Sequence, residues 1–337
     1  MKTSNFVTKA IATALLASQL LGMRAFANAV NVHTFTPSAN PSYMLSEDAL
    51  LHHSWGERLE RPVFFSVFYD MVNDPLVELN GDRTERRATL VDSINSLNLS
   101  VAYSFLPQLQ FGVSTTLSLV QLPEVAQQFA FSDSRLFSKL RLNSESDVVS
   151  FALMPELIIP TGNRTLFLSN NGFGGGMRFI AEHDFNVIQA TANIGYRYSP
   201  DATYRDLNMR SVVPASLGIV KPLGSRWAIN ADLSGEITLP LNTHTNPSQV
   251  YLGAKYRISQ DFIASAGGSI GAFNDRSSAN YQIIAGLTMM PSAAKKSEPI
   301  PFQRVEPVAV VPAPIVVSAV AKPRVIFTPK ELLITEE

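Results

Sequence analysis

The sequence NVIQATANIGYRYS, residues 186–199, decides how the rest of this chain is interpreted. With a period of two, apolar residues from Ile188 to Tyr198 share one face, and polar residues from Gln189 to Arg197 share the other. Strands of soluble domains usually run about five or six residues, whereas a tilted strand that crosses a bilayer needs about nine to eleven. This alternation is long enough for the second kind. We therefore expect it to repeat around a closed barrel in an outer membrane, with its apolar face toward lipid.

The same alternation recurs between residues 63 and 290 and predicts an all-β fold, a transmembrane antiparallel up-and-down β-barrel of about 12 strands. The predicted strands are 63–73, 93–105, 109–120, 133–142, 147–160, 173–183, 187–199, 211–221, 226–238, 249–258, 262–272 and 280–290. Short connections, as at 107–108, alternate with long ones, as at 200–210. Outer-membrane barrels have tight periplasmic turns and long external loops. We therefore expect both ends of the barrel in the periplasm.

Parity also assigns the side chains. Charged residues within the strands fall on the polar face, and we predict that they line the lumen: Arg135, Lys139, Arg141, Glu156, Arg178, Glu182, Arg197, Asp232, Glu236, Lys255 and Arg257. A basic side chain that faced lipid at mid-membrane would cost about 2 to 4 kcal/mol, so a membrane would enforce this sorting. Basic residues outnumber acidic ones in this set, so the charges could either pair into a plug or line a narrow channel with a mild preference for anions.

Apolar residues of the opposite parity, such as Leu233 and Ile283, are predicted to face lipid. Aromatic residues near the strand ends are expected to form the girdles at the lipid interface: Tyr69, Tyr103, Tyr196, Tyr198, Trp227, Tyr256 and Tyr281. The longest predicted external loop, 74–92, carries a mixed-charge run: Asp82, Arg83, Glu85, Arg86 and Arg87. Simple solvation and a surface-interaction role both account for such a run.

The composition favours an exported membrane protein. Residues 1–27 have the basic start, the apolar run and the small-x-small ending (Ala25 to Ala27) of a signal peptide. That run is too short for a membrane-spanning helix, which needs about twenty residues. Charged residues make up 16% of the chain and the net charge is -1, so no basic field is available for nucleic acid. With 0 cysteines the chain has no disulfide and no thiolate metal site.

Two segments flank the predicted barrel. Residues 28–62 lack sustained alternation and are interpreted as a periplasmic N-terminal segment, which forms either a short helix starting near Ser46 or a plug. Residues 291–337 are rich in proline and are interpreted as a disordered periplasmic linker and tail.

Three patterns invite a chemical interpretation, and each lacks a necessary part. His52 and His53 have no carboxylate or further histidine at a metal-ligand spacing. The run 174–176, Gly-Gly-Gly, lacks the Lys-Ser/Thr and the helix of a phosphate loop, so we expect a strand that a neighbouring group approaches closely. His183 beside Asp184 is the only local pairing for a catalytic triad, and we place it in a periplasmic turn. We expect no enzyme activity, no cofactor and no metal.

Residues 30–290 resemble the N-terminal barrel of the OmpA family of outer-membrane proteins. The resemblance is carried by Phe35-Thr-Pro37, NDPLV (73–77), FSDSRLFSKLRL (131–142), MPELIIPTGN (154–163), FLSNNGFGGGMRFIAEH (167–183) and NIGYRY (193–198). PTGN also resembles a strand end in barrels of the phenol-degradation transporter family. In the OmpA family a Pro-rich linker leads to a domain that grips peptidoglycan through an Asp and an Arg. Here the linker is present and no residues match that pair, so we expect no direct peptidoglycan binding by this chain.

Two functions follow as expectations. The first is a non-enzymatic barrel of the outer membrane, embedded in lipid, which acts as a narrow porin-like channel or as a structural barrel with a periplasmic tail. The alternative is a surface-interaction, adhesion or envelope-anchoring protein with a plugged, non-conducting barrel. In either case the tail could contact periplasmic envelope proteins, and nucleic acid is not a partner.

Overall fold

The computed structural model describes residues 31, 35–39, 42–49, 53–54, 57–58, 63–79, 86–144, 147–170, 172–204, 207–209, 211–239, 246–272 and 278–291. The predicted signal peptide and the predicted tail beyond residue 291 lie outside these residues. No helix within the described ranges has the length and apolar character to cross a membrane.

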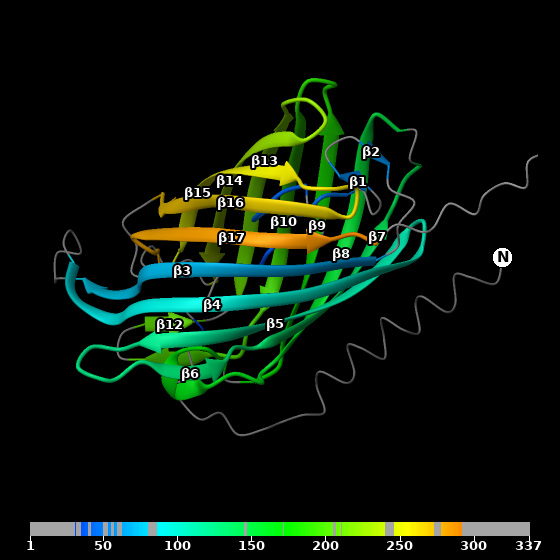
Figure 1. Ribbon diagram of the computed structural model, residues 1–337. Coiled ribbons are helices and arrows are strands. Elements are labelled where there is room, and N and C mark those ends of the chain that lie inside the picture. The colour runs from blue at the N-terminus through cyan, green and yellow to red at the C-terminus, as the bar shows by residue number, and fades with distance from the viewer. Residues whose placement is uncertain are drawn as a thin grey trace, which may run out of the picture. The chain divides into compact units, whose positions relative to one another are not determined.

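Twelve long antiparallel strands close into one barrel (Figure 1). They are β3 (Val63–Leu79), β4 (Arg86–Leu106), β5 (Leu109–Gln121), β7 (Ser134–Arg141), β8 (Val149–Ile159), β9 (Gly174–Asp184), β10 (Gln189–Tyr198), β13 (Val212–Pro222), β14 (Trp227–Thr238), β15 (Ser248–Arg257), β16 (Phe262–Gly271) and β17 (Tyr281–Met289). Closure comes from β4, which pairs with both β3 and β5. A closed sheet leaves no edge of unpaired backbone groups, which a lipid environment requires.

The remaining elements are short. β6 (Gln128–Phe131) pairs with β5 beyond the point where β7 pairs, so β6 and β7 together form one strand of the wall. β1 (His53–Ser54) pairs with β2 (Glu57–Arg58), and β11 (Ala202–Tyr204) pairs with β12 (Leu207–Met209). One 3-10 helix, η1 (Arg164–Leu166), lies in the connection between β8 and β9.

The predicted count of twelve strands is confirmed, and most bounds agree to within a few residues. One connection was predicted wrongly. β3 continues to Leu79 and β4 already begins at Arg86, so the loop reduces to residues 80–85. The chain reads as broken at Asn73-Asp-Pro, but Asp74 takes a positive φ of 48° and the register shifts, after which Leu76 pairs with Val91. Arg86 and Arg87 therefore lie in β4, while Asp82, Arg83 and Glu85 fall outside the described residues.

The two faces of the wall differ in chemistry. On β14, Leu233 is 44% exposed on the outside, while its neighbour Asp232 is only 2% exposed on the inside. The same contrast occurs on β17, where Ile283 is 50% and Gln282 is 3% exposed. Large apolar side chains cover the outer surface all around the barrel. A contiguous apolar surface of this kind needs a non-aqueous neighbour.

Glycines let β9 and β10 pair closely. A Cβ atom on Gly176 would lie 2.6 Å from the carbonyl oxygen of Tyr196, and one on Gly195 would lie 2.5 Å from that of Met177. Both distances are too short for any other residue. The glycine run at the start of β9 thus serves strand pairing, as expected from the sequence.

Apolar side chains also gather inside the barrel. One cluster joins the ends of β3, β4 and β5 nearest the long connections to the residues around η1, among them Leu76, Ile94, Val120, Leu166 and Leu168. A second cluster includes Tyr43 and Ala49 of the N-terminal segment together with Phe64, Phe137 and Ile180 of the wall. The interior is therefore largely filled, and its contents include chain from before the first strand.

Candidate functional site

Residues 42–49, here called the inner segment, cross the barrel interior and are held by side chains of the wall. The backbone N–H groups of Met44 and Ser46 donate to the two carboxylate oxygens of Asp232 on β14, at 3.3 and 3.1 Å. The backbone N–H of Ala49 donates to Glu182 on β9, at 2.9 Å. Charged acceptors make such hydrogen bonds stronger than neutral ones. The carboxylates of the wall therefore accept the backbone hydrogen bonds that a neighbouring strand would accept in a β-sheet.

Glu47, at the centre of the inner segment, is held through both its backbone N–H and its carbonyl oxygen. The backbone N–H of Glu47 donates to Oδ1 of Asn193 at 2.7 Å. The carbonyl oxygen of Glu47 accepts hydrogen bonds from Thr191 at 2.8 Å and from Asn193 at 3.0 Å. Both wall residues lie on β10, the strand whose alternation identifies the fold. Its polar face contacts the chain's own backbone.

The side chains of the inner segment make ion pairs with β7. Lys139 donates to Glu47 at 3.2 Å and to Asp48 at 2.8 Å, and all three side chains are almost completely buried. Arg135 lies 3.9 Å from the other carboxylate oxygen of Glu47. Burial alone would raise the pKa of Glu47, but the positive charges of Lys139, Arg135 and Arg178 hold it below its ordinary value. Glu47 therefore stays ionised at neutral pH.

Tyr43 anchors the start of the inner segment. Its hydroxyl donates to Glu182 at 3.2 Å, and its carbonyl oxygen accepts from Lys255 at 2.9 Å. Burial, followed by the negative charges of Glu182 and Asp48, raises the pKa of Tyr43, so the hydroxyl keeps its proton and stays a donor. Its ring packs where Gly218 of β13 has no side chain.

These contacts place residues 42–49 in the lumen, where the plug alternative for residues 28–62 expects them. None of the described residues 42–49 is helical, and the rest of the short helix expected from Ser46 falls outside the described residues. The helix signal was a local one, an N-cap serine followed by acidic residues. Those acidic residues, Glu47 and Asp48, instead pair with Lys139.

Two further ion pairs lie within the wall itself. Arg135 donates to Glu156 at 2.7 Å, and Arg197 donates to Glu236 at 2.5 Å. Both pairs join predicted lumen residues of different strands, and all four face the barrel interior. Arg178 faces the same region and borders the cavity described next.

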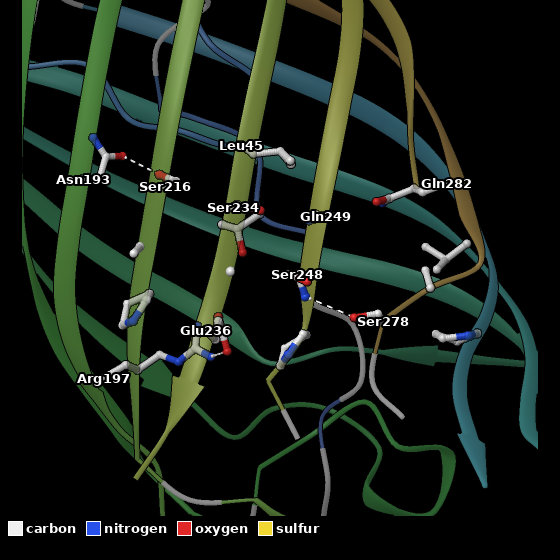
Figure 2. A pocket seen from close by; sticks show the side chains of 18 of the residues that line it. Leu45, Asn193, Arg197, Ser216, Ser234, Glu236, Ser248, Gln249, Ser278 and Gln282 are labelled. Atoms are coloured by element: carbon white, nitrogen blue, oxygen red, sulfur yellow. Dashed lines mark hydrogen bonds and ion pairs between the residues drawn. The ribbon is translucent and has the colours of Figure 1, made fainter. Parts of the chain in front are cut away.

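A cavity of about 90 Å³ lies beside the inner segment (Figure 2). Its lining combines apolar residues with hydroxyl and amide side chains and one ion pair, and the polar part includes Asn193, Arg197, Ser216, Ser234, Glu236 and Gln282. Leu45 of the inner segment contributes to its lining, and Arg197 and Glu236 point toward each other across it. These wall residues lie toward the ends of β10, β13, β14 and β17 that meet the long connections. The cavity is smaller than usual small-molecule sites, which span about 300 to 1,000 Å³.

The other predicted lumen residues are placed as follows. Arg141 is buried and donates to the carbonyl oxygen of Ser144 at 2.8 Å, close to the turn that follows β7. Arg257 occupies the end of β15 and is partly exposed.

The predicted girdle aromatics face outward, with one difference in height. Trp227 and Tyr256 lie on neighbouring strand ends with ring centroids 4.5 Å apart. Tyr69 is not near a strand end, because β3 is longer than predicted and Tyr69 pairs with Leu97 and Ala285 in mid-wall. Its hydroxyl donates to Asn95 at 2.8 Å on the outer face. That partner reduces the cost of placing a polar group at this depth.

The patterns considered for catalysis or metal binding do not converge. His183 is half-buried near the end of β9, with its Nδ1 2.6 Å from the carbonyl oxygen of Val148 and its ring against Phe185. Among the described residues no group of three or more His, Cys, Asp or Glu side chains could hold a metal ion. His52, and the side chain of His53, fall outside the described part of the chain.

Sequence reasoning identified the wall and offered residues 28–62 as a plug, but it did not assign the side chains that hold that segment in place. Tyr43, Glu47 and Asp48 were not singled out, because the segment before residue 63 shows no strand periodicity to position them. One signal was available. The predicted lumen charges are mainly basic, and Glu47-Asp48 is an adjacent pair of carboxylates just upstream of the barrel.

The fold and its interior define a class: a closed twelve-stranded antiparallel barrel with an apolar outside and a polar inside that the chain itself occupies. No family model matches the sequence, and no curated protein is significantly similar to it. The OmpA-family resemblance therefore stays a prediction.

Solved structures do match the fold. One is an outer membrane channel from Pseudomonas putida F1, with a TM-score of 0.56 and 11% identity, over 68% of this chain and 96% of that chain. The NanC porin matches with a TM-score of 0.49 and 8% identity, over 67% of this chain and 100% of that chain. The P. putida toluene transporter TodX matches with a TM-score of 0.42 and 10% identity, over 80% and 99%. The first likeness shows a shared fold, and the other two are too weak to show that much.

Proposed function

We propose that this chain is a non-enzymatic barrel of the outer membrane that acts as a narrow channel, closed in this conformation by the inner segment. One observation carries the proposal: residues 42–49 are joined to the wall only by hydrogen bonds, ion pairs and packing, inside a barrel whose outer face is apolar. Noncovalent contacts can be exchanged for water or solute. The similar fold of a bacterial outer membrane channel supports the same proposal.

The same features support a location and partners. We propose that membrane lipid is the direct neighbour of the apolar outer face, and that the short turns and both ends of the barrel lie in the periplasm. We further propose that the tail contacts periplasmic envelope proteins. The predicted lumen charges do not identify a particular solute, but the excess of basic over acidic residues among them favours anions over cations.

A second candidate is a structural barrel that serves the envelope or contacts other surfaces without conducting. The filled interior supports it, since apolar clusters and wall ion pairs occupy much of the lumen. Single-channel recordings in planar bilayers separate the two candidates. They should compare the full-length protein with a variant that combines Asp232→Asn and Glu182→Gln.

The double substitution removes the negative charge from the two carboxylates that bind the backbone of the inner segment. Hydrogen bonds to charged groups contribute about 1.5 to 3 kcal/mol each, so we expect the open fraction to rise by about tenfold or more. Asp147→Asn, in the exposed turn between β7 and β8, is the matched control and should leave the recordings unchanged. If neither protein shows current steps, the structural barrel replaces the channel.

A further inference from the structure

Within the part of the chain that the structure describes, Lys139 of the wall has no carboxylate of the wall as its partner. It lies on β7 and is completely buried, and the residue opposite it on β5 is the uncharged Gln110. Within the described residues its two hydrogen bonds both go to the inner segment, to Glu47 and Asp48. Arg197, in contrast, is paired with Glu236 of the wall. The partners of Lys139 therefore leave the site whenever the inner segment leaves.

The inward face of β7 is basic along its length. Its buried residues are Arg135, Phe137, Lys139 and Arg141, and the outward residues between them include Leu136 and Leu140. Arg135 also stands over the ring of Phe137, at 5.0 Å from its centroid. No acidic residue occurs on β7, so this face requires negative charge from elsewhere. Glu156 supplies part of it to Arg135, at 2.7 Å.

A buried ammonium group is costly to leave without an anion or water. When the inner segment withdraws, Lys139 faces an opened lumen with both of its anionic partners gone. A solute that carries two carboxylates a few atoms apart would restore what Glu47 and Asp48 provide. A neutral solute would not, and a monocarboxylate would restore only half.

We infer that Lys139 and Arg135 form a binding site for a small dicarboxylate solute, which Glu47 and Asp48 occupy as an internal ligand in the closed conformation. The inference rests on the proposed function, because the solute reaches the site when the channel is open. The solute and the inner segment compete for one site. Binding of the dicarboxylate therefore shifts the population toward the conformation with the inner segment displaced.

The test follows the inner segment directly. The chain has 0 cysteines, and Ser46 is completely buried against Gly218, so a full-length Ser46→Cys protein in lipid vesicles has one thiol that is shielded in the closed conformation. The rate of its labelling by a maleimide is measured by mass spectrometry. Succinate is the probe, and chloride at equal ionic strength, acetate and 1,4-butanediol are the comparisons.

Succinate at ten times its Kd for the displaced state should accelerate labelling by about tenfold, since binding multiplies the population of that state by one plus the ratio of the succinate concentration to Kd. Acetate should accelerate it less, and butanediol not at all. In a protein that also carries Lys139→Gln, labelling should be faster from the start and should no longer depend on succinate. Arg141→Gln, on the same face of β7 but bonded to Ser144, is the matched control and should keep the response. If Lys139→Gln does not fold, Arg135→Gln should reduce the response instead.

Two results would overturn the inference: no acceleration by succinate, or equal acceleration with and without Lys139. Its failure can be told apart from failure of the channel. Current steps in bilayers without any succinate effect on labelling leave the channel and remove the dicarboxylate site. Succinate-dependent labelling without current steps leaves the site and removes the channel.

Discussion

Gly218 of the wall lies directly against the inner segment. A Cβ atom at this position would lie 2.7 Å from the ring of Tyr43, 2.8 Å from Asp232 and 3.0 Å from Ser46. The closed conformation therefore requires that position 218 of β13 carry no side chain. A methyl group there would crowd the segment and leave the outer face of the strand unchanged.

Gly218→Ala should consequently open the channel without unfolding the barrel. Overpacking costs about 1 to 3 kcal/mol, and 1.4 kcal/mol corresponds to about a tenfold change in an equilibrium, so the open fraction in single-channel recordings should rise by about fivefold to a hundredfold. Gly235→Ala on the neighbouring strand is the control, because its Cβ would meet only ordinary contacts at 3.5 Å. An open fraction that stays at the wild-type level in Gly218→Ala would show that Tyr43 does not close the lumen.

At the scale of the strand, β14 shows how the wall separates two environments. Asn230 and Asp232 point inward and are buried, while Ile229 and Leu233 point outward and are exposed. A strand in a soluble sandwich would bury its apolar side instead. The outward orientation of the apolar side chains on β14 is therefore favourable only if the barrel is surrounded by a non-aqueous medium.

Leu233→Arg should weaken folding into phospholipid vesicles. A basic side chain at the bilayer midplane costs about 2 to 4 kcal/mol, and near the interface about 0 to 1 kcal/mol. The control is Leu223→Arg in the turn between β13 and β14, where Leu223 is 50% exposed. Urea titrations of both variants measure the difference. Equal stability of Leu233→Arg and wild type would mean that lipid does not contact this face.

Strands of this kind could be predicted because the polarity of each residue indicates whether it faces the lipid or the lumen. The alternation in β10 and β14 follows from the membrane and the pleat, so a single sequence contains it. The extension of β3 and β4 could not be read in the same way. Asp74 and Pro75 break the alternation, and only the buried contacts of Leu76 and Val91 show that pairing resumes beyond them.

At the scale of the whole molecule, the barrel and its contents differ in how far the sequence determines them. The inner segment has no periodicity of its own, and its path is set by wall groups far away in the chain, such as Asp232 and Glu182. The ion pair between Glu47 and Lys139 joins residues far apart in the sequence, and no pattern around either residue predicts it. The wall was therefore predictable from the sequence. Of the candidate site, only the residues that lie on the strands of the wall could be predicted.

The central claim is that the inner segment closes the lumen, and a reversible covalent lock tests it most directly. Ser46→Cys combined with Gly218→Cys places two thiols in a chain that otherwise has 0 cysteines. The Cβ atoms would start 3.0 Å apart and need to separate slightly, because disulfides join Cβ atoms about 3.5 to 4.5 Å apart. The measurement is single-channel conductance before and after reduction. Because a side chain at position 218 crowds Tyr43, our account predicts frequent current steps in the reduced protein and none in the oxidised protein, where the disulfide holds the segment in place against that crowding. Undiminished conductance with the disulfide formed would contradict it.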